Sequence, residues 1–222
     1  MNLKKYLPFI AVIVVAVVIV GGIFIVKKIT QPVAVDTAVE DASVPDLPDN
    51  EKPIAGLIPT SDGHYLVLNV DSIKVPGANS MDYDLLWKAN NSGTTTQQGT
   101  SSTVQLNGQT NFSKKLLLGS ESNGKFRYDQ GVENGTLTLR FRDGNGKLLG
   151  KVTTDFHMQT GTTTLSSVDG SFKYTLTKAA TGVYFVTMQP FSTPDTSKVV
   201  VFQKGFAIYA SDGLPHTGSV TP

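Results

Sequence analysis

Residues 136–156 read TLTLRFRDGNGKLLGKVTTDF, and this stretch decides the fold class. Apolar and polar residues alternate on both sides of the segment DGNG, which is the period of a half-buried β-strand. Asp, Asn and Gly tolerate the positive φ that a tight turn requires, so DGNG (residues 143–146) predicts the turn of an antiparallel hairpin. The apolar residues of both strands fall on one face: Leu137, Leu139, Phe141, Leu148, Val152 and Phe156.

The same alternation recurs through most of the chain after residue 56, and no segment there has a helical period. Asp-Gly and Asn-Gly pairs separate many of the alternating segments, as expected of short antiparallel strands. We therefore predict an all-β fold, an antiparallel β-sandwich in preference to a barrel. The predicted strands cover residues 64–70, 82–89, 103–106, 114–118, 125–128, 136–142, 148–157, 163–167, 172–177, 183–188 and 199–209.

Two short motifs add a resemblance to immunoglobulin-like and fibronectin-type-III-like domains. Residues 181–186, TGVYFV, resemble the start of the strand that carries the tyrosine corner in those domains, with Tyr184 as the corner residue. Trp87 resembles their core tryptophan. The separation of Trp87 and Tyr184 exceeds the usual spacing, so the resemblance implies extra strands or an insertion between them.

A different pattern occupies the N-terminus. Residues 6–26 carry no charge and are flanked by two lysines at each end. A helix over residues 8–26 is roughly 28 Å long, close to the hydrocarbon thickness of a bilayer. The apolar core exceeds that of a secretory signal and no small-residue cleavage site follows it, so we expect an uncleaved signal-anchor in residues 1–28. We predict a single pass through the cell membrane, with a cytoplasmic N-terminus and an extracytoplasmic C-terminal domain.

Charge and composition divide the remainder. Residues 29–56 hold six acidic residues, one lysine and four prolines, and are predicted to be an extended linker. Residues 57–212 are predicted to be one β-sandwich domain, because a split near residue 160 would leave a C-terminal piece too small to be stable alone. The net charge of the chain is +1, so it lacks the basic field of a nucleic-acid-binding protein. The absence of cysteine excludes a lipoprotein attachment site.

Catalytic, cofactor-binding and metal-binding motifs are not recognisable. His64, His157 and His216 stand singly, without a second ligand at metal-binding spacing. Asp155 lies in phase with His157 and could orient its imidazole, although two solvent-facing neighbours are the simpler interpretation. Residues 143–147 begin like a calcium loop but lack the distal glutamate, which favours a turn. We therefore expect a protein that is not an enzyme and uses no cofactor.

Two further segments carry weaker signals. The run SGTTTQQGTSS at residues 92–102 is polar and of low complexity, as in an exposed loop or an edge hairpin. The C-terminal pentamer matches the Leu-Pro-x-Thr-Gly sorting signal that sortases cleave between Thr and Gly: Leu214, Pro215, His216, Thr217 and Gly218. In that family an apolar segment and a basic tail follow the pentamer, and only residues 219–222 follow here. The alternative is that residues 213–222 form a disordered tail.

Residues 116–128 resemble sequence from bacterial envelope proteins without an assigned activity, which implies a surface location. Our first hypothesis is a single-pass, membrane-anchored protein whose domain binds a protein or glycan at the cell envelope. The second is a structural or accessory subunit of an envelope assembly, such as a secretion or pilus-like complex. The third is an enzyme whose site is assembled only by the fold. The sequence does not indicate an oligomeric state.

Overall fold

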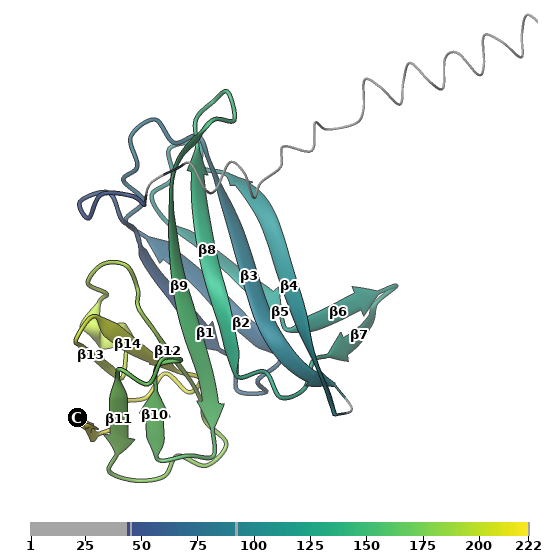
Figure 1. Ribbon diagram of the computed structural model, residues 1–222, viewed down its shortest axis with the longest axis vertical. Helices are drawn as coiled ribbons and strands as arrows, with labels where there is room; N and C mark the ends of the chain where they lie inside the picture. Colours follow the sequence, from purple (N-terminus) through teal and green to yellow (C-terminus); the bar gives the residue numbers. More distant parts are fainter. Residues whose placement is uncertain (1–43, 45, 92, 222) are drawn as a thin grey trace, which may run out of the picture. The chain divides into compact units, whose positions relative to one another are not determined.

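The computed structural model describes residues 44, 46–91 and 93–221, and this part of the chain consists of antiparallel β-sheets (Figure 1). The all-β prediction is confirmed. The predicted membrane span at residues 6–26 lies outside the described residues, among which no helix is long and apolar enough to cross a bilayer. The strands are β1 Ile54–Pro59, β2 Tyr65–Asp71, β3 Ser80–Asn91, β4 Thr94–Gln105, β5 Phe112–Leu117, β6 Gly119–Ser122, β7 Lys125–Tyr128, β8 Asn134–Arg142, β9 Leu148–Thr160, β10 Thr164–Ser166, β11 Lys173–Leu176, β12 Tyr184–Met188, β13 Val201–Gln203, β14 Phe206–Ala210 and β15 Gly218–Thr221, with one 3-10 turn, η2 Thr196–Lys198.

The predicted hairpin forms the centre of a seven-stranded sheet of order β13-β14-β12-β9-β8-β3-β4. All six apolar residues that the alternation places on its inner face are buried. The turn is closed by Asp143, whose Oδ1 accepts hydrogen bonds from the backbone N–H groups of Asn145 (2.8 Å) and Lys147 (2.9 Å). The outer face is polar, and there Arg142 Nε donates a hydrogen bond to Asp82 Oδ2 at 2.7 Å. The predicted hairpin and its two faces are confirmed.

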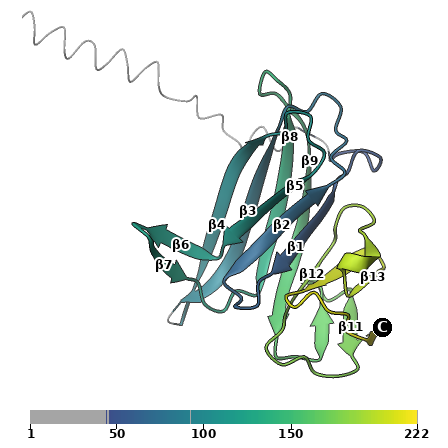
Figure 2. The same ribbon diagram turned by 180° about the vertical axis from the view of Figure 1, so that it is seen from behind.

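A three-stranded sheet of order β1-β2-β5 lies across the inner face of the long strands (Figure 2). Leu57, Leu66 and Leu68 from this sheet belong to the same buried cluster as Leu137 and Phe156 from the seven-stranded sheet. The alternating apolar residues of both sheets thus make one core, an arrangement compatible with a β-sandwich.

A second cluster lies on the other side of β12 and β14, under the sheet of order β10-β11-β15. Phe185 and Ile208 belong to this second cluster, whereas Val186 and Tyr209, their neighbours in sequence, belong to the first. Both faces of β12 and β14 are therefore covered. This explains why these two strands are buried almost continuously while β8 and β9 alternate.

The Trp87 and Tyr184 strands are not neighbours. β8 and β9 lie between β3, which carries Trp87, and β12, which begins at Tyr184. Along the chain, the eight strands β4 to β11 separate the two residues. Trp87 is buried in the first cluster, and the ring of Tyr184 packs under Gly63, where an added Cβ would lie 2.5 Å from Cζ.

Other boundaries need correction. The compact unit begins at Val44, so the expected linker ends earlier than residue 56. Leu47 is buried, and its backbone N–H donates to the carbonyl of Lys151 at 3.1 Å. The predicted strand 199–209 is two strands, because Lys204 and Gly205 both take positive φ and close a two-residue turn. β1 and β6 were not predicted.

The polar run at residues 92–102 and the C-terminal tail also contribute strands. From Thr94 onward the polar run belongs to β4, which pairs with β3 over its whole length, as the edge-hairpin interpretation required. Disorder was expected over residues 213–222, but β15 pairs with β11 from Gly218 to Thr221. Polar side chains obscured β15 and most of β4, of which only residues 103–106 were predicted outright as a strand, because hydrogen bonding between backbones requires no apolar face.

Candidate functional site

A cleft of about 400 Å³ opens where three parts of the fold converge. The turn between β1 and β2 supplies Asp62 and His64, the loop between β7 and β8 supplies Asp129 and Glu133, and the end of β9 supplies His157. Two of the three histidines, predicted to be scattered, thus line one cleft. His216 does not line it.

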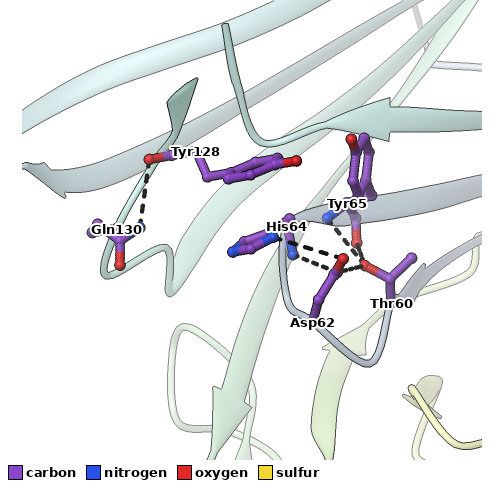
Figure 3. Close-up of polar contacts among 6 residues, drawn as sticks. All are labelled: Thr60, Asp62, His64, Tyr65, Tyr128 and Gln130. Atoms are coloured by element: carbon purple, nitrogen blue, oxygen red, sulfur yellow. Dashed lines mark hydrogen bonds and ion pairs between the residues drawn. The ribbon is translucent and has the colours of Figure 1, made fainter. Parts of the chain in front are cut away.

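The turn at residues 60–65 is fixed by its own polar groups (Figure 3). The Thr60 hydroxyl donates to Asp62 Oδ1, and the backbone N–H of His64 donates to the same oxygen at 3.0 Å. The hydrogen bond from Thr60 has the largest effect on the pKa of Asp62, and together the two bonds lower this pKa below its ordinary value. Asp62 is therefore an anion at neutral pH, and its other oxygen lies 3.6 Å from His64 Nδ1.

Aromatic side chains gather beside this turn. We call His64, Tyr65, Phe126 and Tyr128 the ring stack. The His64 and Tyr128 rings lie parallel, with centroids 3.8 Å apart and 4° between planes. The Phe126 ring is parallel to the Tyr128 ring, with centroids 6.2 Å apart. The Tyr65 ring meets the Tyr128 ring edge-on, with centroids 6.1 Å apart (Figure 3).

The ring stack is open to solvent at one end. Phe126 is 48% exposed, which is unusual for a large apolar side chain. The β6–β7 hairpin that carries it projects beyond the edge of the sheets (Figure 1, Figure 2). Lys115 Nζ caps the Tyr65 ring 3.9 Å from its centroid, a cation–π contact. The Tyr65 hydroxyl raises the pKa of Tyr128, so this phenol is neutral at physiological pH.

Asp129 joins the cleft to the core. Its side chain is buried, with Oδ2 accepting from Trp87 Nε1 at 2.9 Å and Oδ1 accepting from Asn91 Nδ2 at 3.1 Å. Its backbone N–H donates to Leu118 at 2.9 Å. Because both carboxylate oxygens already accept hydrogen bonds, Asp129 acts as a structural brace. Among the described residues no group of three His, Cys, Asp or Glu side chains is arranged to hold a metal ion.

His157 is engaged separately from Asp155. Its Nδ1 lies 2.9 Å from the carbonyl oxygen of Ser166, so Nδ1 carries the proton and donates it there. Asp155 instead accepts from Thr136 at 3.0 Å, and the two side chains do not form an orienting pair. The Ser166 hydroxyl lies 3.3 Å from the same nitrogen, but a protonated nitrogen cannot serve as its base. His157 Nδ1 therefore does not activate the Ser166 hydroxyl.

The sorting-like pentamer lies away from the ring stack, against β11. Leu214 is 60% exposed. The His216 ring meets Phe185 edge-on at 5.0 Å, and its Nε2 lies 3.0 Å from Asp212 Oδ1. Burial opposes ionisation of Asp212, but the hydrogen bonds from His216 and the Leu214 backbone outweigh it and lower its pKa.

The bond that a sortase would cut is tied to the sheet on both sides. The Thr217 carbonyl accepts a hydrogen bond from the backbone N–H of Thr177 at 2.9 Å. Gly218, the first residue of β15, pairs with Leu176 of β11. Cleavage between Thr217 and Gly218 would therefore require β15 to separate from β11.

The ring stack was missed by the sequence analysis. Residues 64–65 and 126–128 are about sixty positions apart, and neither segment has a catalytic or binding motif. One signal was present: Phe126 and Tyr128 alternate on a short predicted strand, which places two aromatic rings on one face. Comparison of the chain with protein-family models, with curated proteins and with solved structures found no match, so the candidate site stands on its geometry alone.

Proposed function

We propose that this chain is a single-pass, membrane-anchored protein of the cell envelope whose extracytoplasmic domain, an immunoglobulin-like β-sandwich, binds a glycan without catalysing a reaction. The ring stack beside the cleft carries this proposal. The C–H groups on one face of a sugar ring pack against a flat aromatic surface, and the sugar hydroxyls need polar partners at its rim. Phe126 and Tyr128 supply the surface, and the carboxylate of Asp62 supplies a hydrogen-bond acceptor.

The cleft and the first described residues of the chain lie toward opposite ends of β9. The described chain meets the long strand β9 at Leu47, which packs over Gly150 near the start of that strand. Residues 157–160, at the other end of β9, line the cleft. Nine residues of strand span roughly 30 Å, so the cleft lies about that distance along β9 from the contact between Leu47 and Gly150.

The hydrogen bonds of two titratable residues that line the cleft favour a binding role over an enzyme. His157 Nδ1 donates to a backbone carbonyl and Asp129 accepts from Trp87 and Asn91, so neither group is available as a base through those atoms. A protein ligand is the alternative occupant of the ring stack, since exposed aromatic residues also anchor protein interfaces.

Glycan binding can be tested with residues 44–222, which contain both hydrophobic clusters. On a glycan array we expect saturable binding to a defined sugar class. Phe126→Ala should weaken it roughly two- to tenfold, the value of one aromatic contact. Val168→Ala, which truncates another exposed apolar side chain, should leave it unchanged. Binding that is absent for every glycan, or unaffected by Phe126→Ala, would remove the basis of the proposal.

The anchor and its orientation have a separate test. Protease added to intact cells should remove the β-domain if it lies outside, and full protection in cells with a permeable outer layer would contradict that orientation. Leu214→Ala tests the sorting signal without disturbing packing, because Leu214 is exposed. If the pentamer is a second tether, this variant should lose attachment to the cell wall. Unchanged attachment would leave the pentamer as the connection between β14 and β15.

A further inference from the structure

The strand β4 is a long edge of the seven-stranded sheet. It pairs with β3 along all twelve of its residues, Thr94 to Gln105, without a register shift. On its other side no strand is paired with it in the part of the chain that the structure describes. Since an antiparallel strand directs the N–H and C=O groups of alternate residues to each side, about half of its residues turn these groups outward.

The other sheet edges in the described chain are protected in ways that β4 is not. Each edge strand besides β4 has six residues or fewer. Lys114 and Lys115 lie on β5, Lys125 and Arg127 lie on β7, and β1 ends at Pro59. Short length, charge and proline are the devices that prevent sheet edges from pairing with other chains.

None of these devices occurs on β4. Its sequence, TTTQQGTSSTVQ, has no charged residue, no proline and no bulge. Its side chains are mostly exposed, and its Val104 is a partly buried residue that packs against the first cluster. The edge is therefore suited to extension by another strand that is equally long, neutral and polar.

We propose that a second copy of this chain pairs antiparallel with β4 and extends the two sheets into one. A strand that pairs with itself meets a partner of equal length and, in this case, no like charges face each other across the pair. Two-fold symmetry requires one residue to face its own counterpart at the axis. Overlap of the strands is greatest when that residue is Gly99 or Thr100, at the middle of β4.

The absence of cysteine from the chain makes a direct test available. Single cysteines would be placed in turn at residues 96–103 of the full-length, membrane-bound protein and oxidised. We expect disulfide-linked dimers to peak at one position near the middle of β4 and to fall on both sides. The control is Ser120→Cys, on the exposed short strand β6, which should form few dimers.

Other patterns would overturn the proposal. Equal crosslinking at every position would indicate parallel, in-register association. Crosslinking no greater than the control would indicate a free edge, and crosslinking that appears only after residues 1–43 are removed would indicate that the chain covers its own edge. Thr100→Lys places like charges beside the axis and should weaken the dimer at least tenfold by light scattering in detergent, whereas Ser120→Lys should not. An unchanged dimer in Thr100→Lys would contradict pairing at the middle of β4.

Discussion

Replacing Asp129 by alanine should destabilise the domain and loosen the cleft at the same time. The substitution leaves two donors unpaired, the indole N–H of Trp87 and the side-chain amide of Asn91. Trp87 is 2% exposed, so water cannot readily replace the lost acceptor. A hydrogen bond to a charged group contributes about 1.5–3 kcal/mol, and an orphaned buried donor costs about 1–3 kcal/mol. We expect a loss of about 3 kcal/mol in the free energy of unfolding.

The loss of stability can be followed by tryptophan fluorescence. The chain contains a single tryptophan, so its fluorescence reports on Trp87 alone. Urea unfolding of residues 44–222 should give a midpoint lowered in proportion to the loss, and the melting temperature should fall by roughly 6–12 °C. Asp129→Asn, which retains one acceptor oxygen, should lose about half as much. The two variants should also shift the tryptophan emission.

A double-mutant cycle isolates the contact. In a Trp87→Phe background the indole donor is gone, so Asp129→Ala should cost about 1–2 kcal/mol less than in the parent. Because this background has no tryptophan, all four proteins of the cycle would be followed by circular dichroism. If Asp129→Ala lowers stability by less than about 0.5 kcal/mol, the buried carboxylate is not a brace. Equal costs in both backgrounds would likewise refute the reasoning.

Three further predictions concern other parts of the fold. Gly150→Ala places a Cβ 2.4 Å from Leu47 Cδ2, so Leu47 should leave β9 and its backbone N–H should lose protection from hydrogen exchange; retained protection would contradict this packing. The pKa of Asp62 is lowered on folding, so its contribution to stability is present above the ordinary value of 3.8 and is lost as the pH falls through the lower folded pKa. Asp62→Asn should therefore flatten the fall in stability that urea titrations measure below about pH 4, and an unchanged acid limb would be contrary to expectation. Thr187→Val removes a buried hydroxyl that has no partner among the described residues and should raise stability by about 1–2 kcal/mol; a thermal melt showing a loss would indicate a partner for that hydroxyl.

The strands that sequence predicted well are those with one apolar face. In β8 and β9 the faces alternate because one side meets the core and the other meets water. β12 and β14 lack this alternation since two clusters cover them, and the turn at Lys204 was lost inside an apolar run. Most of β4, beyond the predicted residues 103–106, and the whole of β15 gave no clear strand signal for the opposite reason, because their exposed side chains carry no apolar alternation.

The candidate site was less predictable than the fold. Asp129 and Trp87 meet across 42 positions of sequence, and His64 stacks on Tyr128 across a longer interval, 64 positions. Such contacts depend on how sheets pack, which residue spacing does not encode. The sorting-like pentamer from Leu214 to Gly218 lies elsewhere, at the junction with β15.

The central claim is that the ring stack binds a glycan, and a nuclear magnetic resonance titration tests it most directly. A sugar that binds residues 44–222 would be added to protein with labelled aromatic side chains. We expect saturable shifts of the Phe126 and Tyr128 ring resonances and of the His64 imidazole that stacks on Tyr128. Glycan binding that shifts other residues and leaves these three rings unchanged would contradict the claim.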